Sequence, residues 1–159
     1  MDVGHIHPIL LVEDEADDAS FVRRALEKAR IRNPLVVCGT AAKARGVLAT
    51  PNDAERPALL IIDIFLPGKE TGLDFLGWLR TQQAPLGQLP AMIYSASTES
   101  AHASTAKALG SVVFLRKPAT EDALANAVQA LGFVIATTRA HGRLERVITP
   151  HHTARSAGR

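Results

Sequence analysis

Five side chains that could take part in chemistry stand at the ends of short apolar segments of this sequence. They are Glu13, Asp14, Asp63, Ser95 and Lys117. Each apolar segment has the length and composition of a buried strand. Because ligands of open parallel sheets gather at the carboxyl ends of the strands, we expect these side chains to meet at one edge.

The residue types at this edge suggest phosphoryl transfer. Three carboxylates close together repel one another and raise one another's pKa unless a cation lies among them. Lys117 supplies one positive charge, and the remaining acids favour a hard divalent cation such as Mg²⁺, which binds carboxylates, water and phosphoryl oxygens. With a hydroxyl at Ser95, such a site is equipped to transfer a phosphoryl group to the free carboxylate of Asp63.

Each of these residues also has an ordinary structural interpretation. Residues 13–15 could cap the following helix and favour its first turn. Ser95 could be a capping or turn residue, and Lys117 with Pro118 could form a simple turn. Their joint occurrence, at successive strand ends, favours the functional interpretation.

The elements that would position these residues alternate along the chain. The predicted strands are 9–12, 35–38, 59–62, 91–94 and 112–115, and the predicted helices are 17–29, 41–49, 72–80, 99–109 and 121–131. Consecutive apolar residues, as in 59–62, are typical of strands covered by helices on both faces. The alternation predicts a (βα)₅ fold, α/β in class, with a parallel sheet and right-handed crossovers.

Composition narrows the classes of protein. No apolar run approaches the roughly 20 residues of a membrane helix, and the N-terminus lacks the features of a signal peptide. Cys38 is the only cysteine; it excludes an intrachain disulfide, and its apolar neighbours predict a buried thiol. We therefore expect a cytoplasmic protein that does not enter a membrane.

Charge divides the chain into two parts. Residues 1–131 carry 13 Lys and Arg against 15 Asp and Glu, whereas residues 132–159 carry five Arg against Glu145 alone. Arginines without interleaved aromatic residues do not favour nucleic-acid binding. We expect a domain over 1–131 and an extension over 132–159, in which 132–136 forms a sixth strand or a helix extension and the end after Pro150 is flexible.

Four motifs resemble the receiver domain of two-component response regulators. They are LLVEDE (10–15), LIIDIFLPG (60–68), YSAS (94–97) and FLRKP (114–118), and the resemblance covers about residues 8–131. It implies the flavodoxin-like, doubly wound sheet with strand order 2-1-3-4-5. It also implies that Asp63 accepts a phosphoryl group from the phosphohistidine of a sensor histidine kinase.

The resemblance assigns the other site residues as well. Glu13, Asp14 and Asp63 would hold Mg²⁺, with the backbone carbonyl of Phe65 as a further ligand. Lys117 would pair with the phosphoryl oxygens, and its peptide bond to Pro118 is usually cis in the family.

Signalling would use a two-state packing change. By the resemblance, Ser95 moves to the phosphoryl group and Phe114 turns inward, which alters the surface of the fourth helix, fifth strand and fifth helix. Phe65 and Ser97 occupy positions that modulate phosphoryl lifetime. Because an apolar Phe65 cannot orient a water molecule, we expect slow self-dephosphorylation.

The sequence departs from the family at four places. Ser95 replaces the commoner Thr, and Phe114 replaces a frequent Tyr. Glu13 replaces the commoner Asp, which suggests contact with the metal through water. The loop from Asp63 to Gly72 is one residue longer than usual.

A narrower resemblance concerns the stand-alone regulators that partner bacterial phytochrome kinases. It rests on LLVEDEADDASFVRRAL and IIDIFLPGKETG. The 28 residues after 131 leave no room for a DNA-binding module, which favours a stand-alone switch that catalyses its own phosphorylation and dephosphorylation. Members of that group often dimerise through the face of the fourth and fifth helices, and some dimerise through C-terminal extensions. We therefore expect a homodimer, in which 133–136 and the following residues form an exchanged arm.

Two other classes stay open. A phosphorylation-independent pseudo-receiver would keep the fold and act as a binding or dimerisation module. A nucleotide-binding flavodoxin-like protein would need a glycine-rich phosphate loop after the first strand, where Glu13, Asp14 and Glu15 stand instead. Acidic side chains there would repel phosphate.

Overall fold

Five parallel strands form the central sheet of the computed structural model, which describes residues 6–50, 52–111, 113–132, 135–140 and 143–148. The strands are β1 (Ile9–Val12), β2 (Leu35–Cys38), β3 (Leu59–Ile62), β4 (Ala91–Ser95) and β5 (Val113–Arg116). Their order is β2-β1-β3-β4-β5, and all four pairings are parallel. The predicted fold class and strand order are confirmed.

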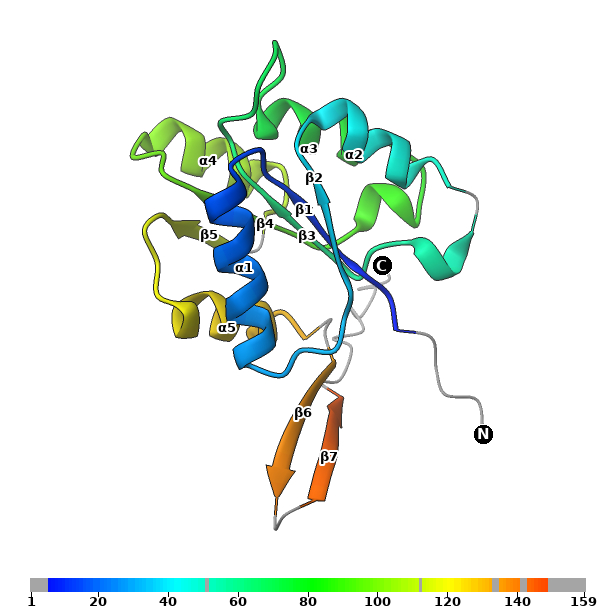
Figure 1. The fold of residues 1–159 in the computed structure, drawn as a ribbon. Coiled ribbons are helices and arrows are strands. Elements are labelled where there is room, and N and C mark those ends of the chain that lie inside the picture. The colour runs from blue at the N-terminus through cyan, green and yellow to red at the C-terminus, as the bar shows by residue number, and fades with distance from the viewer. Residues whose placement is uncertain (1–5, 51, 112, 133–134, 141–142, 149–159) are drawn as a thin grey trace, which may run out of the picture.

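Helices cover both faces of this sheet (Figure 1). They are α1 (Ala16–Lys28), α2 (Ala41–Leu48), α3 (Gly72–Arg80), α4 (Ser100–Ala108) and α5 (Glu121–Ala130), with short 3₁₀ helices η1 (Asp53–Glu55) and η2 (Leu86–Gln88). The predicted strands and helices agree with the structure to within one residue at each end. The 3₁₀ helices were not predicted.

Alternate residues of the inner strands β1, β3 and β4 enter two separate cores. In β1, Ile9 and Leu11 pack with residues of α1 and α5, whereas Leu10 and Val12 pack with residues of α2, α3 and α4. This is the period-two alternation of a strand, with both sides apolar because both are covered. Cys38 lies in the core beneath α2, α3 and α4 as a buried free thiol, as predicted.

Gly72 allows α3 to begin against the end of β3. A Cβ atom at this position would lie 1.9 Å from the backbone oxygen of Asp63, so any other residue would push the two segments apart. A capping box between Thr71 and Asp74 then fixes the first turn of α3. The start of this helix thus holds the backbone at Asp63 in place.

Arg80 joins the end of α3 to its neighbours. Its guanidinium donates to the carbonyls of Leu109 and Leu89 at 2.7 Å each, and more weakly to those of Gly87 and Gly110. Burial lowers the pKa of Arg80. Because the last carbonyls of a helix lack partners within it, this contact also closes the end of α4.

The last described residues form an antiparallel hairpin of β6 (Ile135–Ala140) and β7 (Arg143–Ile148). Of the two alternatives for 132–136, the strand is right from residue 135, Gly132 lies in a turn, and 133–134 lie outside the described residues. The second strand was not predicted. Figure 1 shows the hairpin extending away from the sheet and its helices.

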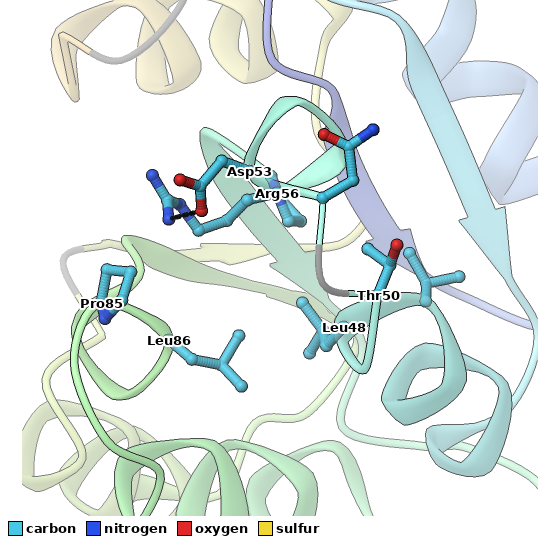
Figure 2. A pocket seen from close by; sticks show the side chains of 9 residues that line it. Leu48, Thr50, Asp53, Arg56, Pro85 and Leu86 are labelled. Carbon is cyan, nitrogen blue, oxygen red and sulfur yellow. Dashed lines mark hydrogen bonds and ion pairs between the residues drawn. The ribbon is translucent and has the colours of Figure 1, made fainter.

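A surface cavity of about 190 Å³ lies at the amino ends of the strands, between the end of α2, η1 and η2. Its wall is apolar at Leu48, Pro85 and Leu86, and Asp53 pairs with Arg56 at its rim at 2.8 Å (Figure 2). None of the five candidate residues lines it. Among the described residues, no helix combines the length and apolar character needed to cross a membrane.

Candidate functional site

The three predicted metal-binding carboxylates meet at the carboxyl edge of the sheet. Glu13, Asp14 and Asp63 each offer an oxygen that lies within 4.8 Å of the other two. They come together because Val12 of β1 pairs in register with Ile62 of β3, so the residues that follow are neighbours. Glu13 and Asp63 are buried, and Asp14 is exposed.

Lys117 places its ammonium group directly on this cluster. Nζ donates to Oε2 of Glu13 at 2.8 Å and to Oδ2 of Asp63 at 3.1 Å. The peptide bond to Pro118 is cis, as the resemblance implied. Lys117 reaches the cluster from β5, two strands away from Asp63, because its backbone N–H donates to the carbonyl of Ser95.

A third carboxylate holds the same ammonium group. Asp18, in the first turn of α1, accepts a hydrogen bond from Lys117 Nζ at 2.8 Å. Sequence reasoning missed this residue, because an acid in the first turn of a helix is ordinary. Only the packing of α1 beside the edge of the sheet reveals the contact.

Burial and the contacts within the cluster shift the pKa values of Glu13 and Lys117. Burial raises the pKa of Glu13 to about 7, with a contribution from the charge of Asp63, although the hydrogen bond from Lys117 opposes the shift. For Lys117, burial alone would lower the pKa, but the hydrogen bonds to Asp18 and Glu13 outweigh it and the net pKa is raised. One ammonium group thus lies among four carboxylates, those of Glu13, Asp14, Asp18 and Asp63.

The donor set fits a hard divalent cation. All three side chains supply carboxylate oxygens, which Mg²⁺ and Mn²⁺ prefer over softer ligands. A bound cation would also favour the charged form of Glu13, which burial disfavours. The remaining oxygen of Asp63, Oδ1, accepts a long hydrogen bond of 3.3 Å from the N–H of Phe65.

Ser95 carries a hydroxyl without a hydrogen-bond partner. Its side chain is fully buried at the end of β4, and among the described residues its Oγ is the one buried side-chain oxygen or nitrogen left unpaired. Such a group costs about 1–3 kcal/mol of stability. Buried polar groups of this kind are rare and call for a functional explanation.

The predicted modulating residues, Phe65 and Ser97, are linked by a histidine of α4. Ser97 is buried, and its Oγ lies 2.6 Å from Nδ1 of His102. The ring of Phe65 meets the ring of His102 edge-on, with centroids 6.2 Å apart, and its side chain is 54% exposed. His102 was not predicted, since a single histidine in an alanine-rich helix gives no signal.

Phe114, the predicted switch residue, lies outside the acidic cluster. It is partly buried on β5, on the face covered by α4, where it packs against the core. Beside it is a surface hollow of about 280 Å³ that is also lined by Ala103, Ala106, Lys107 and Ser111. The hollow gives the ring adjacent space on the α4 side.

The long loop after β3 is fixed to α2. Arg45 forms a two-fold hydrogen-bonded ion pair with Glu70 of this loop, and its guanidinium lies 5.0 Å from the ring centre of Trp78. Gly68 adopts a φ of 93°, a conformation that favours glycine. These contacts hold the loop against α2 and α3.

The profile of the response regulator receiver domain matches residues 9–129. Comparison with curated protein sequences gave no match. Among solved structures, the bacteriophytochrome response regulator RtBRR is 28% identical, with a TM-score of 0.71 and a match over 86% of each chain.

Two further solved structures are similar. The bacteriophytochrome response regulator AtBRR is 29% identical, with a TM-score of 0.68 over 82% of this chain and 95% of its own. The Mn²⁺-bound form of response regulator Rcp1 is 25% identical, with a TM-score of 0.64 over 77% of this chain and 89% of its own.

Proposed function

The chain belongs to the response regulator receiver-domain family, and on that premise we propose that it is a phosphorylation switch whose acceptor is Asp63. Receiver domains are phosphorylated by histidine kinases and bind Mg²⁺ or Mn²⁺ at an acidic pocket. The observation that carries the proposal is the carboxylate of Asp63, held beside two acids able to bind a cation and hydrogen-bonded to Lys117. These are the parts that phosphoryl transfer to an aspartate requires.

The roles in the proposed mechanism divide between bond making and charge balance. A carboxylate oxygen of Asp63 would form a bond to the phosphorus of the kinase phosphohistidine as the P–N bond breaks and the imidazole leaves. Glu13, Asp14, Asp63 and the backbone carbonyl of Phe65 would hold Mg²⁺, which would supply charge neutralisation. Lys117 exchanges its hydrogen bond to Asp63 for one to a phosphoryl oxygen. This arrangement stabilises charge that is otherwise uncompensated at the edge of the sheet.

Ser95 supplies the switch. We infer that its hydroxyl, unpaired in this structure, donates a hydrogen bond to the phosphoryl group once Asp63 is modified. Movement of Ser95 leaves space for Phe114 to turn inward, and the surface of α4, β5 and α5 changes with it. The free energy of the new hydrogen bond biases the two arrangements.

A phytochrome-type sensor kinase is the partner that we propose. The support is the likeness to two bacteriophytochrome response regulators, at 28% and 29% identity. We place the reaction in the cytoplasm, where an ATP-dependent kinase finds its substrate.

We further propose a homodimer that uses the C-terminal extension, residues 132–159, beyond a receiver domain of residues 1–131. Isolated two-stranded hairpins are marginally stable in water. The hairpin of β6 and β7 extends away from the central sheet (Figure 1), so a second copy of the chain would supply the missing contacts.

Incubation with acetyl phosphate and Mg²⁺, followed by intact mass measurement, tests the central proposal. We expect a gain of one phosphoryl group that depends on Mg²⁺ and is abolished by Asp63→Asn. A pseudo-receiver would gain nothing, and a nucleotide-binding protein would instead bind nucleotide without covalent change. Either result would overturn the proposal.

A further inference from the structure

Lys117 uses all three of its hydrogen-bond donors on carboxylates. An ammonium group has three N–H bonds and no acceptor. The distances from Nζ are 2.8 Å to Glu13, 2.8 Å to Asp18 and 3.1 Å to Asp63. The side chain of Lys117 is only 11% exposed, so these contacts, and not water, satisfy most of its hydrogen-bonding capacity.

Two of these acceptors belong to the metal-binding cluster, and the third does not. Glu13 and Asp63 are members of the cluster, whereas Asp18 is outside it. A divalent cation on Glu13 and Asp63 would compete with Lys117 for their oxygens and would repel its charge. Among the described residues, Asp18 is then the one carboxylate partner of Lys117 that would not also bind the cation.

The surroundings of Asp18 suit this task. Its side chain is 37% exposed, compared with 1% for Glu13, so its charge is less costly to keep. Helix α1 is fixed by the buried residues Val22, Ala25 and Leu26 on its inner face. The ring of Tyr94, 5.2 Å from Nζ, gives the ammonium group a second stabilising neighbour.

We propose that Asp18 is a positioning residue that keeps the Lys117 ammonium group beside the site when a divalent cation occupies Glu13 and Asp63. This inference rests on the proposed function. Asp18 acts through Lys117 and does not touch the metal or the phosphoryl group. Without it, Lys117 has only the metal ligands as anionic partners, and its charge opposes metal binding.

The affinity of the unphosphorylated full chain for Mg²⁺, measured by calorimetry, tests this role. The measurement is made at mildly alkaline pH, because carboxylates bind metal in their charged form. Asp18→Asn should raise the dissociation constant for Mg²⁺ on the order of tenfold, as expected for the loss of a charge-assisted contact.

The neighbouring Asp17 supplies a matched control. Asp17 is exposed and makes no ion pair in the part of the chain that the structure describes, so Asp17→Asn removes the same charge from the same helical turn. Its effect should be less than about twofold, because the charge is screened by solvent. Equal effects of the two substitutions would overturn the proposal.

A double-mutant cycle separates action through Lys117 from direct action on the metal. In a Lys117→Met background, Asp18→Asn should weaken Mg²⁺ binding much less than in the native chain, and Asp18→Glu should restore most of the native affinity. An undiminished effect of Asp18→Asn in that background would show a direct metal ligand and would contradict the inference.

The inference and the proposed function fail in different ways. A native chain that binds no Mg²⁺ and gains no phosphoryl group overturns both. If the native chain binds Mg²⁺ and gains a phosphoryl group, but Asp18→Asn and Asp17→Asn have the same affinity for Mg²⁺, only the role of Asp18 is removed. The proposed phosphorylation switch then stands.

Discussion

At the scale of single residues, the proposed role of Asp63 depends on its neighbours. A carboxylate after an apolar strand is unremarkable in itself, but here a lysine pairs with one oxygen and two further acids stand within ligand distance. One ammonium group lies among these acids. On the proposed function, a divalent cation would balance the remaining negative charge.

The two buried serines of the site differ in their hydrogen bonds, and this difference predicts their effects on stability. Ser95→Ala should leave the free energy of unfolding unchanged or raise it by about 1 kcal/mol, because it removes an unpaired hydroxyl. Ser97→Ala should lower it by about 1 kcal/mol, because Ser97 is bonded to His102. Urea denaturation without metal measures both.

Equal losses from the two substitutions would mean that Ser95 has a partner after all. Ser95→Ala should also uncouple phosphorylation from the change at Phe114. This loss of coupling would distinguish a switch role of Ser95 from a purely structural one.

The apolar side chain of Phe65 leads us to expect a long-lived phosphoryl group on Asp63. Its apolar side chain offers no hydrogen bond to an attacking water, whereas Asn could hold one in position. Phe65→Asn should therefore shorten the lifetime by about tenfold or more, while Phe65→Leu should leave it nearly unchanged. The mass of the phosphorylated protein, followed after removal of acetyl phosphate, gives the rates; an Asn variant no faster than the native chain would refute this explanation.

At the scale of elements, strand ends and helix starts determine where the chemistry lies. Gly72 shows this most clearly, because its missing Cβ lets α3 begin against the backbone of Asp63. The strands could be predicted from the sequence because short runs of apolar residues, buried on both faces, are unambiguous when helices alternate with them. The 3₁₀ helices and the clamp made by Arg80 could not, since both depend on tertiary contacts.

The hairpin of β6 and β7 gives the prediction at this scale. If it contributes to a dimer, light scattering should give the mass of two chains for the full-length protein and the mass of one shortened chain after deletion of residues 132–159. The shortened chain should still accept a phosphoryl group, because the acidic cluster and Lys117 lie before residue 132. A shortened chain that is still dimeric would remove the proposed arm.

At the scale of the whole molecule, parallel strands bring residues that are far apart in sequence to one edge. Lys117 is 104 residues from Glu13 and 54 from Asp63, yet it donates to both. Their meeting could be predicted because topology alone places strand ends together. Asp18 and His102 could not, since they lie on helices, where contact with the edge depends on how each helix packs.

Chemical trapping of the phosphorylated residue tests the central claim most directly. Borohydride reduces an acyl phosphate to an alcohol, so treatment after incubation with acetyl phosphate and Mg²⁺ leaves homoserine in place of the modified aspartate, and peptide sequencing by mass locates it. The account predicts homoserine at position 63 and none in Asp63→Asn. Reduction at Asp14 or Asp18 instead, or at no residue of the native chain, would contradict it.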